Sequence, residues 1–88
     1  MNQDQIKSTV VGYICSSTKY SAEQIHDNHV LKNWPLALDN YSLAFLAISC
    51  DTYIKTIAPN KSVFVREIQK RGLTVKGLVD LVVHKVDS

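Results

Sequence analysis

The sequence predicts an all-α fold of four helices, with a long loop between the first two and a short third helix. Apolar residues recur at spacings of three and four in several segments, the pattern of helices with one buried face. The composition, with 45% apolar and 20% charged residues and only 3 Gly and 2 Pro, is typical of a globular chain. A length of 88 residues leaves room for one core, so residues 1–88 are expected to form a single domain.

The first helix is predicted over residues 3–17. Its apolar stripe consists of Ile6, Val10, Tyr13 and Ile14, with Val11 and Cys15 beside it. Gly12 lies inside this helix and costs about 1 kcal/mol relative to Ala, so tertiary packing must supply the difference.

A long structured loop is predicted to follow. Ser21, with Gln24 three residues further on, forms a capping-box pair for one short turn. Pro35 keeps Trp34 out of helical geometry and so delays the next helix. Trp34 is expected to anchor the loop, with a binding-site aromatic as the alternative. The apolar residues that should hold the loop to the core are Tyr20, Ile25, Val30, Leu31, Trp34, Leu36 and Leu38.

The second helix is predicted over residues 41–55, with Asp39 or Asn40 as its N-cap. It is the most apolar of the four and is therefore expected to be central. Its buried face should consist of Leu43, Leu46, Ala47, Cys50 and Ile54.

A shorter third helix is expected between Pro59 and Gly72. Asn60 or Ser62 can cap its start, and Gly72 is the expected C-cap. Its apolar residues are Val63, Phe64 and Ile68. The basic residues toward its end are Arg66, Lys70 and Arg71. They form either a solvated helix end or a docking surface for an acidic partner.

The fourth helix is predicted to begin after Thr74 as its N-cap. Its apolar stripe consists of Val75, Leu78, Val79, Val82 and Val86. The run LVDLVV is rich in β-forming residues, so a strand is the competing interpretation of this segment.

The charge distribution, the N-terminus and the missing motifs each exclude a class of function. A net charge of +2, spread along the chain, argues against nucleic-acid binding. The N-terminus resembles neither a secretory signal nor a membrane span, so a cytoplasmic protein is expected. The common catalytic signatures, namely a Gly-rich phosphate loop, an HExxH pair and a nucleophile elbow, are lacking, so we expect no enzyme and no catalytic residue.

Cysteine and histidine do not predict a metal site. Cys15 and Cys50 have no CxxC spacing and are expected to be free, buried thiols. His26, His29 and His84 offer too few partners for zinc, and the HDNH stretch is expected to be solvated.

The run LALDNYSLAFLAISCDTYI and the later run LTVKGLVDLVV together resemble the acyl carrier protein family. In that family a loop ending in Asp-Ser-Leu opens the second helix, and a Thr-Val-x-x-Leu-Val segment begins the last one. Residues 6–14 look like the first helix, residues 21–25 like part of the long loop, and residues 74–82 like the closing helix. The resemblance therefore implies a four-helix, acyl-carrier-like bundle over nearly the whole chain.

The chain departs from the family at the serine that carries 4'-phosphopantetheine. Keeping the apolar rhythm in register aligns Asp39 with the motif aspartate and puts Asn40, which has no hydroxyl, at the serine position. Sliding by two residues makes Ser42-Leu43 the Ser-Leu pair. The core positions would then fall on Ser49, Thr52 and Thr56.

Two functions follow from the resemblance. In the first, the chain is a carrier of a fatty-acid, polyketide or related pathway, with phosphopantetheine on Ser42 and Asp39 helping to position the transferase. In the second, Asn40 marks a carrier-like fold without a prosthetic group, which binds a partner protein or a lipid by shape. An unrelated helical adaptor is a third, remoter reading.

The expected partners are biosynthetic enzymes such as a phosphopantetheinyl transferase or a ketosynthase, bound by a monomer. The family's second helix is commonly acidic, whereas here Asp51 is offset by Lys55. Tyr41, Phe45 and Asp51 are the candidate partner contacts. The exposed face of this helix is expected to comprise Tyr41, Phe45, Ser49, Thr52 and Tyr53.

Overall fold

Four α-helices and one 3-10 helix follow one another along residues 3–87, the part of the chain that the computed structural model describes. They are α1 (Gln3–Ser17), η1 (Ala22–Gln24), α2 (Asn40–Ile57), α3 (Val65–Ile68) and α4 (Val75–Asp87). The predicted all-α class, the long loop and the short third helix are confirmed. Residues 78–83, for which a strand was the alternative, are helical, and the described residues form no strand.

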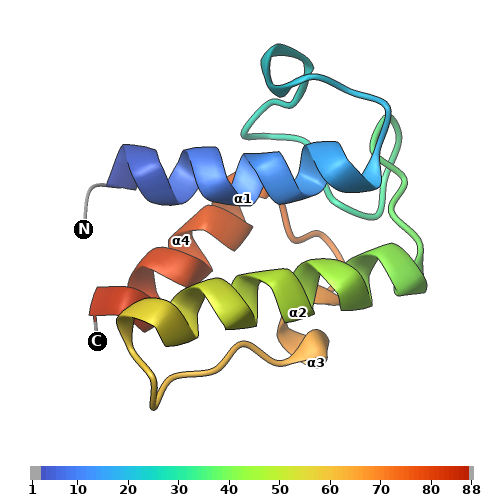
Figure 1. Ribbon diagram of the computed structural model, residues 1–88. Coiled ribbons are helices and arrows are strands. Elements are labelled where there is room, and N and C mark those ends of the chain that lie inside the picture. The colour runs from blue at the N-terminus through green and yellow to red at the C-terminus, as the bar shows by residue number, and fades with distance from the viewer. Residues whose placement is uncertain (1–2, 88) are drawn as a thin grey trace.

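The helices pack around α2, as the sequence predicts. α1 and α2 lie side by side and run in opposite directions, α4 packs against both, and α3 lies against α2 (Figure 1). The radius of gyration of 11.8 Å matches the roughly 12 Å expected of a folded chain of this length. None of the described helices is long and apolar enough to cross a membrane.

One apolar core joins all four helices and the long loop. The predicted core face of α2 is confirmed, because Leu43, Leu46, Cys50 and Ile54 are completely buried. The completely buried residues outside α2 are Ile6, Val10, Ile14, Leu31, Ile68, Val75, Leu78 and Val82. The described part of the chain buries no polar or charged residue.

The last turn of α1 is closed by its own hydroxyl groups. Ser16, Ser17 and Thr18 each donate to the carbonyl four residues earlier, at 3.1 to 3.3 Å. This turn has no basic residue, and the Thr18 hydroxyl satisfies the Ile14 carbonyl, which lies among the last four of the helix, while Ser16 and Ser17 add second bonds to carbonyls inside it.

The long loop covers the start of α4. The backbone N–H groups of Val75 and Lys76 donate to the carbonyls of His29 and Asp27 at 2.9 and 3.0 Å. The predicted Thr74 cap is confirmed, because its Oγ1 accepts from the N–H of Gly77 at 3.0 Å. The loop and the last helix are thus held together by backbone bonds as well as by apolar contacts.

Trp34 does not anchor the loop, so that prediction was wrong. Its side chain is 87% exposed, whereas Leu36 and Leu38 are buried. The N–H of Ala37 donates to the carbonyl of Asn33 at 2.8 Å, which closes a turn with Trp34 at its outer edge.

The third helix also differs from its prediction. It starts after Phe64, so neither Asn60 nor Ser62 is its N-cap. Asp51 accepts from the N–H of Val63 at 2.9 Å and so holds the preceding segment extended along α2.

Gly72 does not end the third helix, which stops at Ile68 with Gln69 as its C-cap. It lies instead in the turn closed by the N–H of Leu73 and the carbonyl of Lys70, at 3.3 Å. Its φ of +82° is in the left-handed region that favours glycine.

Candidate functional site

The start of α2 is built around Asp39. This residue is the N-cap, as predicted, and its Oδ1 accepts from the backbone N–H of Ser42 at 2.8 Å. Hydrogen bonding from Ser42, first through its backbone N–H and then through its hydroxyl, lowers the pKa of Asp39. The carboxylate therefore fixes the first turn and stays ionised at neutral pH.

Asn40 and Ser42, the two residues that could occupy the position of the motif serine, have different surroundings. Asn40 is the first residue of α2 and is exposed, two residues before the half-buried Ser42. Ser42 lines a shallow hollow of about 340 Å³ between the end of α1 and the start of α2. The other residues lining this hollow are Ser16, Ser17, Tyr41 and Phe45.

The first three turns of α2 carry an apolar stripe that the structure leaves exposed. Tyr41 is 89% exposed, Phe45 54% and Ile48 63%. Their spacing of four and three residues puts them on one side of the helix. We call Tyr41, Phe45 and Ile48 the α2 stripe.

Sequence analysis missed Ile48. The signal was available, because Ile48 follows Phe45 by three residues and lies outside the core pattern. Tyr53 was placed on the exposed face, but it is half-buried, and its hydroxyl is buried without a hydrogen-bond partner among the described residues. Thr52 is exposed as predicted, whereas Ser49 is half-buried.

Asp51 has two intramolecular partners. Its carboxylate pairs with Lys55 at 2.9 Å, and the same oxygen accepts the N–H of Val63 at 2.9 Å. The hydrogen bond from Lys55 is the largest cause and lowers the pKa of Asp51. Desolvation is the second and raises it, and the bond from the N–H of Val63 adds a smaller lowering, so the net effect is a lowered pKa. Lys55 also donates to the hydroxyl of Ser62, so this group ties α2 to the segment before α3.

The two cysteines lie in different environments and are both free. Cys50 is buried, which raises the pKa of its thiol to about 12. Cys15 is only half-buried, so the prediction of two buried thiols was wrong for it. It lies at the edge of the buried face of α1, next to Ile14.

His26 and His29 contact each other. Their rings meet edge to face with centroids 5.0 Å apart, and Nδ1 of His29 accepts the backbone N–H of His26 at 3.2 Å. Within residues 3–87 no three His, Cys, Asp or Glu side chains are placed to hold a metal ion.

The basic residues predicted near the third helix are all exposed, but only Arg66 is part of that helix. Lys70 and Arg71 lie in the turn that follows it. The guanidinium of Arg66 stacks over the ring of Phe64, 4.7 Å from its centroid.

Comparisons of this chain with protein-family models, with curated proteins and with solved structures find no match.

Proposed function

We propose that this chain is an acyl-carrier-like protein that binds partner proteins through the start of α2 and carries no phosphopantetheine. The observation that carries the proposal is the position of Asn40, the first residue of α2, directly after the N-cap Asp39. The motif of the resembled family has its modified serine after such an aspartate, and the carboxamide of Asn40 has no hydroxyl to accept the group.

The burial pattern of α2 supports this register. Alignment of Asp39 with the motif aspartate assigns core positions to Leu43, Leu46, Cys50 and Ile54, and all four are completely buried. The register that makes Ser42 the motif serine would assign core positions to Ser49, Thr52 and Thr56. Of these, Ser49 is half-buried and the two threonines are exposed.

The α2 stripe is the surface that we assign to partner binding. Exposed aromatic and aliphatic side chains grouped on one face mark interaction sites, because water contact with such a patch is unfavourable. Asp51 is engaged by Lys55 and by the backbone N–H of Val63, so its carboxylate is less available to a partner than the exposed apolar side chains of the α2 stripe. The partners that fit are biosynthetic enzymes with an apolar recess for Tyr41, Phe45 and Ile48.

A loaded carrier is the second candidate function. Its support is the position of Ser42 in the first turn of α2, where its side chain lines the hollow beside Tyr41. In that case Ser42 would hold 4'-phosphopantetheine, which supplies the thiol for a thioester-linked cargo, and Asp39 would position the transferase.

Intact mass after incubation with a broad-specificity phosphopantetheinyl transferase and coenzyme A tests both candidates. We expect no adduct on the natural chain or on Ser42→Ala, and one adduct on Asn40→Ser. The double variant Asn40→Ser with Ser42→Ala should keep that adduct. Circular dichroism of each variant verifies that it is folded.

The other outcomes are equally informative. An adduct on the natural chain that Ser42→Ala removes would replace the proposal by the loaded carrier. No adduct on any variant, under conditions that load a known carrier protein, would contradict the acyl-carrier-like assignment itself.

A further inference from the structure

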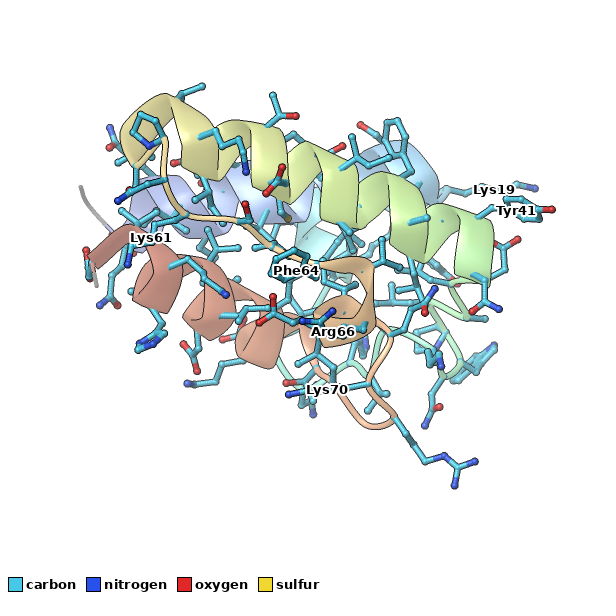
Figure 2. All side chains as sticks on the ribbon, turned by 90° about the horizontal axis from the view of Figure 1, so that it is seen from below. Lys19, Tyr41, Lys61, Phe64, Arg66 and Lys70 are labelled. Carbon is cyan, nitrogen blue, oxygen red and sulfur yellow. The ribbon has the colours of Figure 1, made fainter. Side chains whose placement is uncertain are left out.

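A second surface, away from the α2 stripe, combines an exposed aromatic ring with several cations. Two hollows of about 340 and 350 Å³ share Phe64 and Lys85 in their linings. Lys61 lines the first hollow, and Arg66 and Lys70 line the second. We call Lys61, Phe64, Arg66, Lys70 and Lys85 the basic face. Figure 2 shows Lys61, Phe64, Arg66 and Lys70 spread over one side of the molecule, with Tyr41 at its far end.

The charge of the basic face is concentrated. Four cations and one carboxylate, Glu67, line the two hollows, which gives a local charge of +3 with histidine neutral. The whole chain carries only +2, so the rest of the molecule is slightly negative. Glu67 pairs with Lys85 at 3.3 Å. No ion pair in the described part of the chain involves Lys61, Arg66 or Lys70.

Phe64 gives this charged surface an apolar centre. Its ring is 49% exposed, although the neighbouring Val63 is buried. Arg66 stacks on the ring and lines the second hollow, so its guanidinium lies beside the aromatic surface there. Aromatic and arginine side chains are enriched at protein interfaces, so Phe64 and Arg66 are the residues expected to contribute most to binding here.

We propose that the basic face binds an acidic segment of a partner protein, with an apolar side chain of that segment placed on Phe64 and its carboxylates on the surrounding cations. Charge complementarity selects this occupant. A nucleic acid is a poorer fit, because neutralisation of several phosphates supplies most of such affinity and this face has four cations, one of them paired with Glu67.

The proposal does not depend on the function of α2. Basic docking residues lie on the segment before α3, on α3 and the turn after it, and on α4, whereas the α2 stripe lies on the first three turns of α2. The chain could therefore bind one partner through an apolar contact and an acidic segment through this face.

The test is a titration of the isotope-labelled protein with a short synthetic peptide rich in Glu and containing one central Phe, followed by NMR. We expect chemical-shift changes at residues 61–70 and 84–85. The affinity should fall as salt is added, because the contacts are ionic and exposed. Lys70→Glu should weaken binding about tenfold, since it replaces an attraction by a repulsion.

Lys19→Glu is the matched control. It changes the net charge by the same amount, but Lys19 lies at the same end of the molecule as Tyr41, away from Lys61 and Lys70 (Figure 2). We expect it to alter the affinity by less than about twofold. Phe64→Ala should weaken binding without changing the charge.

Four results would overturn the proposal. The first is that Lys70→Glu and Lys19→Glu weaken peptide binding equally, and the second is that the chemical-shift changes are centred on Tyr41 and Phe45. The third is that no shift changes occur at millimolar peptide. The fourth is that an oligonucleotide of equal charge binds more tightly than the peptide at the same salt concentration.

Discussion

Removal of the Asp51 carboxylate should destabilise the fold more than its position on α2 suggests. Asp51→Ala deletes the acceptor for the N–H of the buried Val63 and the partner of Lys55. A hydrogen bond to a charged group contributes roughly 1.5–3 kcal/mol, and the partial exposure of Asp51 favours the lower end of this range. With a few tenths more from the ion pair, we expect a loss of about 2 kcal/mol in the free energy of unfolding.

Urea denaturation followed by circular dichroism measures this loss. The melting temperature should fall by roughly 8 to 16 °C, given about 4 to 8 °C per kcal/mol for a domain of this size. Asp51→Asn keeps a carbonyl acceptor for Val63 and should recover about half of the loss. Asp80→Ala is the control, because it removes an exposed pair with Lys76, and no backbone N–H of residues 3–87 outside the helix's own bonds donates to the Asp80 carboxylate. A loss at Asp51 no larger than that at Asp80 would refute the reasoning.

The effect of Asp51 should depend on pH. Its pKa is lowered in the folded chain, so its contribution is present above the unfolded value of about 3.9 and is lost as the pH falls through the folded value. The difference between the natural chain and Asp51→Ala should therefore be constant from pH 7 to about 5 and should shrink below pH 4.

Three further predictions follow from burial and backbone geometry. Cys15 should react with a thiol reagent in the folded protein, whereas Cys50, buried and with its pKa raised to about 12, should react only after addition of denaturant; two equally fast thiols in the native state would contradict this. Leu46→Ala should lose about 3 kcal/mol of unfolding free energy and Ile48→Ala less than about 0.5, because only Leu46 is in the core; similar urea midpoints for the two variants would disprove the assignment of faces. Gly72→Ala should lower the melting temperature by several degrees, because its φ of +82° costs a residue with a Cβ about 1 kcal/mol; an unchanged melting curve would show that the turn adapts.

The sequence predicts the parts of the fold that depend on short-range pattern. The buried face of α2 follows from a spacing of three and four residues, and the caps Asp39 and Thr74 follow from polar side chains placed just before apolar periodic segments. These features need only the local chain, so the sequence alone was sufficient to place them.

Features set by distant contacts could not be predicted in the same way. The third helix starts late because Asp51, twelve residues away, holds Val63, and the start of α4 is covered by carbonyls of Asp27 and His29. The exposure of Trp34 could not be predicted from its apolar character, because Leu36 and Leu38, in the same segment, are the side chains that are buried.

The residues of the candidate site were chosen from the resemblance, and their roles stay predictions. Asp39, Asn40, Ser42, Tyr41 and Phe45 lie together at the start of α2, as the resemblance implies. The burial of Leu43, Leu46, Cys50 and Ile54, against the exposure of Thr52 and Thr56, is what the structure adds in favour of the Asn40 register.

The most direct test of the central claim is the mass of the α2 segment in the protein isolated from the cells that make it. Trypsin cleaves after Lys32 and Lys55, so the peptide 33–55 contains both Asn40 and Ser42. If α2 works without a prosthetic group, this peptide from growing cells should be found only at its unmodified mass. A phosphopantetheine adduct on Ser42 in a substantial fraction of the peptide would contradict the claim and identify the chain as a loaded carrier.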